Sequence, residues 1–145
     1  MIISSVKNSH QTLRQLYHDN CVVCGCSNEN GLGLRFETKY NGEVVAIFDC
    51  SDCFQGYPST LHGGVISSLL DGAMTNCLFA HGKAAMTGEL KVRFRHPVTT
   101  DCKAVIRAWI ENSYPPLHFM KAELTQGGLL KAKAEAKFVE RGNNR

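Results

Sequence analysis

The segment from residue 62 to residue 80 constrains the fold most, because its apolar side chains surround most of a predicted helix. At 100° per residue they cover a face too broad for a surface helix, so near-complete burial is predicted. The residues of this face are Val65, Ile66, Leu69, Leu70, Ala73, Met74, Cys77 and Leu78. A helix of this kind needs other elements around it on most sides.

Segments that alternate apolar and polar residues follow this helix. The period of two predicts half-exposed antiparallel strands over 86–94, 103–111, 118–125 and 130–139. In the first of these strands, one predicted face carries Met86, Gly88, Leu90, Val92 and Phe94, and the other carries Thr87, Glu89, Lys91 and Arg93. These strands must supply the cover that the apolar helix needs.

The region before the helix predicts a hairpin and a short helix. Asn41-Gly42 is a strong hairpin signal between strands expected at 33–40 and 43–50. Helical spacing of Leu13 and Leu16 indicates a helix over 9–18, within an N-terminal arm of residues 1–20. One long helix cannot cover both faces of a five- or six-stranded sheet. The pattern therefore favours an α+β fold in which a curved antiparallel sheet wraps around the helix at 62–80.

Length and charge limit the possible classes of function. The 145 residues fit one domain, 1–145, and the formal net charge of +3 gives no case for nucleic acid or membrane as a partner. No apolar run approaches the roughly 20 residues of a membrane span. The first 20 residues lack the apolar core of a signal peptide, so a cytoplasmic location is expected.

A lone carboxylate, Asp71, lies in the middle of the predicted helix. Ser67, Asp71 and Thr75 follow at i, i+4 and i+8 and form one narrow polar stripe beside the apolar face. Because that face leaves little helix surface for solvent, we expect Asp71 to be only partly exposed and to have a raised pKa. Such a group is a candidate base or nucleophile. The alternative is an ordinary solvent-facing aspartate.

Two glycines, Gly63 and Gly64, follow His62 at the predicted start of the helix. A helix N-terminus presents unpaired N–H groups and the positive end of the helix dipole. Glycine lets a ligand approach that backbone without a Cβ in the way. Together these features suit an oxyanion hole, the site of developing negative charge in acyl transfer. The alternative is close packing of the helix start against a strand.

The two halves of this candidate site lie too far apart to act within one chain. The nine residues from His62 to Asp71 span about 13.5 Å of helix. Either the features are unrelated, or each belongs to a site completed by a second subunit. In a two-fold dimer with antiparallel helices, Gly63 of one chain would lie beside Asp71 of the other.

Three motifs carry a resemblance to a known family over about residues 21–138. They are "CVVCG…NGLGLRF", "FQGYPSTLHGGVISSLLDGAM" and "TGELKVRFRHPV". The chain resembles hotdog-fold acyl-CoA thioesterases of the phenylacetate-degradation, PaaI-like branch. The resemblance implies a sheet wrapped around the central helix, homodimers with a continuous sheet, often dimers of dimers, and a site at the dimer interface.

The resemblance also implies roles for individual residues. Asp71 matches the catalytic carboxylate, and Gly63 matches the backbone donor of the oxyanion hole. His62 matches the motif histidine, with a positioning role rather than that of a base. Thr87 matches a residue that helps to orient water or the carboxylate, and Thr75 matches a supporting threonine of another branch.

The sequence departs from the family at two positions of the motif region. Gly72 follows Asp71 where relatives often have an acidic residue, and Gly56 stands where several have Asn or Gln. Gln55, just before it, is the expected substitute in substrate binding, together with Gly64. Four basic residues on and after the next predicted strand are candidates to bind the phosphates of coenzyme A: Lys91, Arg93, Arg95 and His96. The alternative is that they form an ordinary charged face of the sheet.

The expected reaction is hydrolysis of an acyl- or aryl-CoA thioester to the free acid and coenzyme A. Asp71 would attack the carbonyl itself or activate a water molecule, and the sequence does not separate these routes. Coenzyme A is part of the substrate, so no further cofactor and no metal is expected. The alternative is a hotdog protein that binds acyl-CoA without hydrolysis, as a sensor or carrier.

Seven cysteines are an odd number, which favours reduced thiols over a disulfide framework. Cys21/Cys24 and Cys50/Cys53 have the paired spacing of a four-thiolate zinc site. A redox pair and bystander thiols are the alternatives. Zinc binding by all four cysteines would indicate a zinc-ribbon interaction module, a remote alternative that leaves the His-Gly-Gly helix unexplained.

Overall fold

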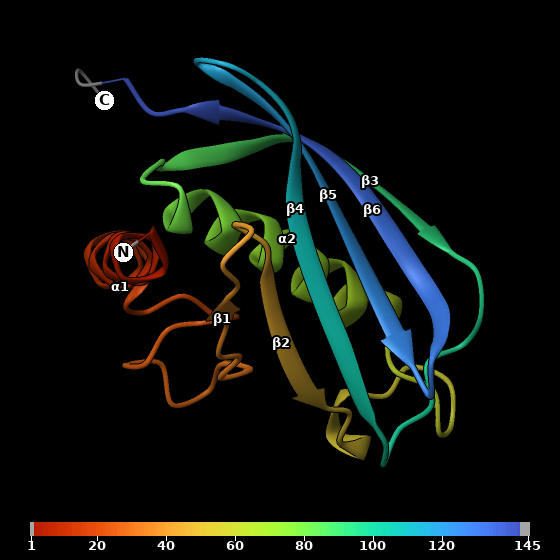
Figure 1. The fold of residues 1–145 in the computed structure, drawn as a ribbon. Helices are drawn as coiled ribbons and strands as arrows, with labels where there is room; N and C mark the ends of the chain where they lie inside the picture. Colours follow the sequence, from red (N-terminus) through yellow and green to blue (C-terminus); the bar gives the residue numbers. More distant parts are fainter. Residues whose placement is uncertain (1, 143–145) are drawn as a thin grey trace.

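The computed structural model describes residues 2–142, with side chains described from residue 7 onward. Two α-helices and six strands make up the fold (Figure 1). In chain order they are α1 (Ile2–His18), β1 (Glu37–Thr38), β2 (Val44–Asp49), the 3-10 helix η1 (Asp52–Phe54), α2 (Gly63–Ala80), β3 (Ala85–Phe94), β4 (Lys103–Tyr114), β5 (Leu117–Gln126) and β6 (Leu129–Glu140). None of the helices in this described part has the length and apolarity that a membrane crossing requires.

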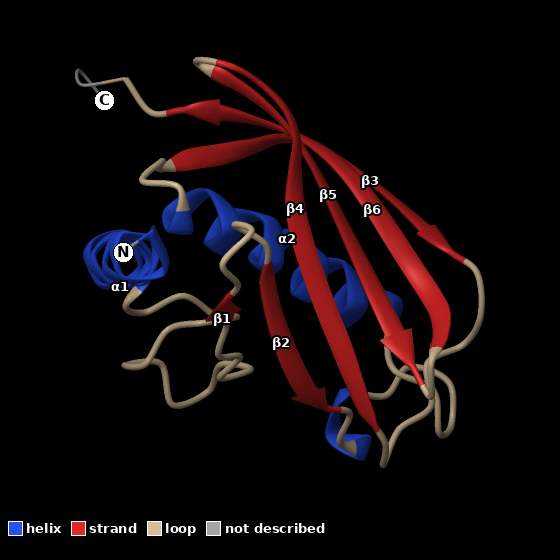
Figure 2. Cartoon of the chain, in the orientation of Figure 1, coloured by secondary structure: helices blue, strands red, loops and turns tan. Residues whose placement is uncertain are grey.

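One antiparallel sheet curves around α2. Its strand order is β1-β2-β4-β5-β6-β3, so β3 forms one edge although it precedes β4 in the chain. α2 lies along the concave side of the sheet, and α1 packs against α2 beyond the β1 edge (Figure 2). The predicted α+β architecture, a sheet wrapped around one long helix, is confirmed.

Small side chains on the sheet let α2 lie close to it. From Leu69 to Ala80 every helix residue except Asp71 is buried. Alanines at alternate positions of β4, β5 and β6 face this helix and are themselves buried: Ala104, Ala108, Ala122, Ala132, Ala134 and Ala136. Alanine is a poor strand former. The strict period of two nevertheless favours a strand, because it buries each alanine and leaves the charged residues beside it at least partly accessible to solvent.

The predicted N-terminal hairpin is much shorter than expected. β1 covers only Glu37–Thr38, because the preceding residues pair with a loop instead of with β2. The Leu32 N–H donates to the Val22 carbonyl at 2.7 Å, and the Leu34 N–H donates to the Val23 carbonyl at 2.9 Å. The helix expected at 9–18 extends back to Ile2, and β4 continues to Tyr114.

The predicted faces of β3 are wrong at its beginning, because the strand contains a β-bulge. Its pairing with β6 shifts between Thr87 and Glu89, which leaves Gly88 as the extra residue. Thr87 therefore pairs with the buried Phe138 and faces inward together with Leu90, whereas simple alternation places it outward with Glu89. Met86, predicted on the apolar face, is 65% exposed.

Candidate active site

Asp71 and Thr87 make the polar contact at the centre of the candidate site. The Thr87 hydroxyl, turned inward by the bulge, donates a hydrogen bond to Asp71 Oδ1 at 2.6 Å. Burial raises the pKa of the Asp71 carboxyl above its ordinary value, and this hydrogen bond from Thr87 opposes part of the rise. Cys21 raises the pKa of Asp71 further, and His18 lowers it. The expected half-buried carboxylate with a raised pKa is present.

The rest of the polar stripe on α2 points back to the helix backbone. The Thr75 hydroxyl donates to the Asp71 carbonyl at 3.1 Å, and the Ser67 hydroxyl donates to the Gly63 carbonyl at 2.9 Å. Thr75 is 7% exposed, so its hydroxyl is satisfied within the helix. Thr75 thus supports the turn that carries Asp71 and does not contact its carboxylate.

The start of α2 has a capped N–H group at Gly64 and an open one at Gly63. His62 is the N-cap residue, and its Nδ1 accepts a hydrogen bond from the Gly64 N–H at 2.8 Å. No acceptor for the Gly63 N–H lies among residues 2–142. His62 therefore holds the first turn in place, while the Gly63 N–H remains available; a positioning role of His62 in catalysis stays a prediction.

A pocket of about 690 Å³ opens at this end of the helix. Its wall is largely apolar and includes Gly63 and, from the end of β3, Phe94. The other lining residues are Gly56, Tyr57, Thr60, Leu61, His62, Ile66, Arg95, His96, Pro97 and Val98. An apolar cavity that ends at an unpaired backbone donor is suited to an acyl group with a polar carbonyl.

The predicted cations separate into two places. Arg95 and His96 line the pocket at the start of α2. Lys91 and Arg93 instead line a small hollow of about 80 Å³ with Lys133 of β6, on the outer face of the sheet. Within one chain, only the first pair lies near the Gly63 N–H.

Asp71 does not line the pocket at Gly63. Asp71 is eight residue steps after Gly63, which corresponds to about 12 Å along α2. The structure thus brings Asp71 together with Thr87, and Gly63 together with His62, Arg95 and the pocket. It does not bring the two groups together within one chain.

Packing explains both departures from the family pattern. A Cβ on Gly72 would meet Val23 Cγ1 at 2.6 Å, so the loop that follows α1 leaves no room for an acidic side chain after Asp71. A Cβ on Gly56 would meet His62 Cδ2 at 3.2 Å, so a larger residue would crowd the N-cap. The Gln55 side chain accepts a hydrogen bond from the Ser59 N–H at 3.1 Å, which holds the intervening turn. Its role in substrate binding stays a prediction.

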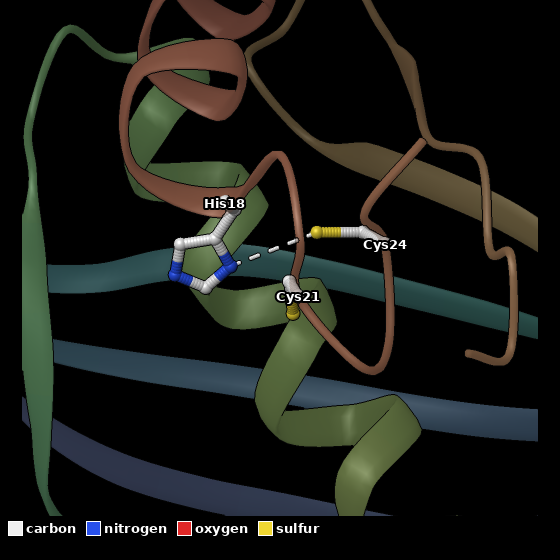
Figure 3. Close-up of side chains that lie close together, drawn as sticks. All are labelled: His18, Cys21 and Cys24. Atoms are coloured by element: carbon white, nitrogen blue, oxygen red, sulfur yellow. Dashed lines mark hydrogen bonds between the residues drawn. The ribbon is translucent and has the colours of Figure 1, made fainter. Parts of the chain in front are cut away.

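The two cysteine pairs lie in different parts of the fold. Cys21 and Cys24 follow α1 and gather with His18 beside α2 (Figure 3). Cys50 follows β2, where its N–H bonds to the Cys102 carbonyl, and Cys53 is exposed in η1. The four-thiolate zinc site is therefore not formed. Sequence reasoning missed His18, because its pairing with these cysteines depends on how α1 ends.

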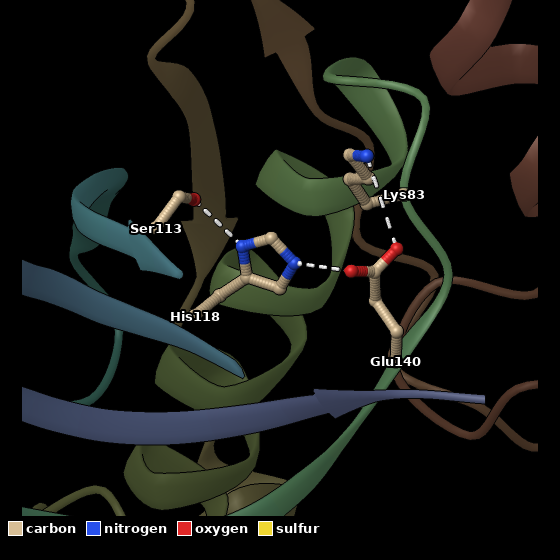
Figure 4. Close-up of polar contacts among 4 residues, drawn as sticks. All are labelled: Lys83, Ser113, His118 and Glu140. Atoms are coloured by element: carbon tan, nitrogen blue, oxygen red, sulfur yellow. Dashed lines mark hydrogen bonds and ion pairs between the residues drawn. The ribbon is translucent and has the colours of Figure 1, made fainter. Parts of the chain in front are cut away.

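A second polar cluster, around His118, was also missed. His118 is 1% exposed on β5, and its Nδ1 lies 2.6 Å from Ser113 Oγ (Figure 4). Its Nε2 lies 3.1 Å from Glu140 Oε2, and Lys83 Nζ lies 3.8 Å from the other carboxylate oxygen. Both ring nitrogens are thereby satisfied, as a buried histidine requires. The signal in the sequence is a polar residue at an inward position of a strand.

A curved antiparallel sheet around one long helix, with an open backbone donor at the helix start, defines a hotdog fold of the thioesterase type. The thioesterase superfamily model matches residues 59–133, just over half of the chain. The chain therefore belongs to the thioesterase superfamily, and the resemblance inferred from the motifs is confirmed.

Individual relatives agree with this assignment. Acyl-coenzyme A thioesterase THEM4 of Bos taurus is 31% identical over 86 residues, which are 57% of this chain and 35% of the relative. The PaaI protein from the phenylacetic acid degradation operon of E. coli superimposes with a TM-score of 0.82, covers 98% of this chain and 97% of its own, and is 16% identical. The structure of smu.793 from Streptococcus mutans UA159, bound to acetyl CoA, gives a TM-score of 0.70 at 18% identity over 75% of this chain and 89% of its own. The chain thus spans about a third of the length of the bovine relative.

Proposed function

We propose that this chain hydrolyses acyl-CoA thioesters at a site that two copies of it build together. The observation that carries the proposal is the unpaired Gly63 N–H at an apolar pocket, with Asp71 about 12 Å further along the same helix. A single chain separates the donor from the carboxylate. A second chain with its helix antiparallel would bring its own Asp71 to that donor.

The edge strand β3 supports such pairing. It is the last strand of the sheet, and most of its residues are exposed. Three of them, Met86 at 65%, Leu90 at 36% and Phe94 at 53%, are large apolar residues. An exposed edge with apolar side chains is suited to a second copy of the same strand. We propose a homodimer across β3.

The chemistry follows from the groups at the two half-sites. The Gly63 N–H would stabilise the oxyanion as the thioester carbonyl is attacked. Thr87 occupies Asp71 Oδ1, so Oδ2 is left to take a proton from water or to attack the carbonyl carbon. The carbon–sulfur bond then breaks, and coenzyme A leaves as the thiolate and takes up a proton. Where Asp71 attacks directly, this leaves a mixed anhydride between Asp71 and the acyl group, which a water molecule then hydrolyses to the acid and the free Asp71 carboxylate. Both routes end in a carboxylic acid and free coenzyme A.

The polar rim of the pocket supports coenzyme A as the leaving group. Arg95 and His96 lie beside the apolar wall that would contact the acyl chain. Coenzyme A carries several phosphate charges, which a guanidinium binds well. The neighbour with bound acetyl CoA has the same fold, and this supports the ligand class. The cytoplasmic location stays a prediction from the sequence.

Mixed dimers test whether the site is shared. Gly63→Val and Asp71→Asn chains, carrying different tags, are coexpressed, and the heterodimer is isolated by both tags in turn. In a shared site, the intact Gly63 of one chain meets the intact Asp71 of the other. The heterodimer should then regain about half of the wild-type activity, because one of its two sites is whole.

Different results would contradict the shared site and the hydrolysis. A heterodimer no more active than either homodimer would show that the site is not shared in this way. A wild-type protein that binds acyl-CoA esters but releases no free thiol from any chain length would contradict hydrolysis, and would indicate a sensor or carrier.

A further inference from the structure

The end of α1 and the loop after it place three metal-binding side chains together. One ligand atom each of His18, Cys21 and Cys24 lies within 4.8 Å of the other two, and Figure 3 shows the three side chains close together at the end of α1. The three residues belong to one short segment with the spacing His-x2-Cys-x2-Cys. They are half-buried or buried, unlike Cys26, which follows two residues later and is exposed.

The spacing of the ligand atoms fits a tetrahedral ion. With a zinc–sulfur bond of about 2.3 Å and a zinc–nitrogen bond of about 2.0 Å, the nitrogen and sulfur of a tetrahedral site lie about 3.5 Å apart. The distance from His18 Nδ1 to Cys24 Sγ is 3.7 Å. The edge of the His18 ring packs against Phe79 with a centroid distance of 5.0 Å, so this nitrogen is held in orientation.

The loop has the backbone contacts that support thiolate ligands. The Val23 N–H points at Cys21 Sγ from 3.3 Å, and such N–H···S contacts stabilise a thiolate. The Gly25 N–H bonds to the Cys21 carbonyl at 2.9 Å and closes the turn. A Cβ on Gly25 would meet the Cys21 backbone nitrogen at 2.4 Å, so only glycine permits this turn.

We propose that His18, Cys21 and Cys24 bind a zinc ion, contrary to the expectation of no metal from the sequence. Two thiolates and one neutral imidazole balance the two positive charges of Zn²⁺, which suits a partly buried site. Sulfur ligands select zinc over the hard cations Mg²⁺ and Ca²⁺. A water molecule completes the tetrahedron at the fourth position.

The role proposed for the zinc ion is structural. It joins the last residue of α1 to the loop that packs on α2 at Gly72, one residue after Asp71. The loop side chain in that contact is Val23, which lies between the two cysteines. Binding the ion therefore fixes α1 and this loop against the central helix.

Metal content and cobalt spectroscopy test the proposal. The whole chain is expressed in medium containing Zn²⁺ and purified in the presence of a phosphine reductant. Its zinc content is measured by inductively coupled plasma mass spectrometry. We expect about one zinc per chain. Replacement by Co²⁺ should give the intense thiolate-to-cobalt charge-transfer absorption and the visible bands of a tetrahedral site.

Matched cysteine variants locate the ion. Cys21→Ser should weaken Co²⁺ and Zn²⁺ binding at least about 10-fold and reduce the charge-transfer absorption. Cys26→Ser changes the same atom outside the cluster and should leave both unchanged. His18→Gln provides a second ligand variant, with circular dichroism to verify that each protein is folded.

Three results would overturn the proposal. The first is reduced wild-type protein that retains no zinc and shows no charge-transfer absorption with Co²⁺. The second is equal cobalt absorption in the Cys21→Ser and Cys26→Ser proteins. The third is a Cys21–Cys24 disulfide in the air-purified protein together with no metal in the reduced form, which would assign the pair to redox chemistry instead.

Discussion

Replacing Gly63 by alanine should stabilise the protein and impair catalysis at the same time. Gly63 does not have a positive φ, and a Cβ built on it would lie 3.6 Å from the Phe94 ring, an ordinary van der Waals distance. Packing within the chain therefore does not require glycine here. The structure thus argues against close strand packing as the reason for this residue.

The expected gain in stability follows from the unfolded state. A Gly→Ala substitution at a compatible position adds about 0.4–1 kcal/mol, because the unfolded chain has less conformational freedom to lose. For a domain of this size, that corresponds to a Tm about 1–4 °C higher. Thermal unfolding followed by circular dichroism measures this change.

The expected loss in activity follows from the place of the new methyl group. It would stand between the Gly63 N–H and Phe94, both of which border the pocket, and would keep a carbonyl oxygen from the donor. Loss of one oxyanion donor costs about 10²–10³-fold in rate. The assay is release of the coenzyme A thiol from a panel of acyl-CoA esters, detected with a thiol reagent.

Gly64→Ala is the contrasting variant. Its Cβ would lie 3.0 Å from His62 Nδ1 and would press on the N-cap, so this protein should lose stability. A Gly63→Ala protein with wild-type kcat/KM would refute the oxyanion role. A Gly63→Ala protein less stable than wild type would refute the packing argument.

Two further predictions concern Asp71 and its neighbour in α2. Asp71→Asn should be more stable than wild type at neutral pH. The folded-state pKa of Asp71 is raised above about 3.8, so ionisation of Asp71 destabilises the folded wild-type protein. The difference in unfolding free energy between variant and wild type should therefore grow as the pH rises from about 4 through the folded-state pKa, and then stay constant. Urea unfolding across this pH range measures the difference, and a gap that is largest in acid would contradict the raised pKa. Gly72→Ala should destabilise the protein, because the new Cβ overpacks against Val23 at 2.6 Å, which costs about 1–3 kcal/mol. The higher helix propensity of alanine offsets up to about 1 kcal/mol of this cost. The Gly72→Ala/Val23→Ala double variant should be less destabilised than the sum of the two single variants, and strict additivity would disprove the contact.

Hydrophobic periodicity was enough to predict the central helix and the succession of strands that follows it along the chain. The helix expected at 62–80 is observed as Gly63–Ala80, and the last three predicted strands lie within β4, β5 and β6. These elements are stabilised mainly by burial of one face, and the spacing of apolar residues in the sequence shows which face that is. β1 was overpredicted, because its residues pair with a loop whose path depends on long-range contacts.

The candidate site was predicted in its residue types and less well in its geometry. Helix spacing alone was enough to separate Gly63 from Asp71 by about 12 Å, beyond the reach of the short aspartate side chain. Alternation placed Thr87 on the wrong face, because one extra residue in a strand leaves no mark on the pattern except a glycine at position 88. The contact between Thr87 and Asp71 agrees with the resemblance, and the structure supplies the bulge as its cause.

The bulge at Gly88 divides β3 into two parts that can change independently. Before the bulge, the alternation of side chains places Thr87 against Asp71 of α2. After the bulge, a shifted alternation places Phe94 at the wall of the pocket. A substitution at Phe94 can widen or narrow that wall without rotating the strand that carries the threonine. In the proposed site, the size of the accepted acyl group and the chemistry at Asp71 are thus open to separate selection, although a single strand carries residues of both.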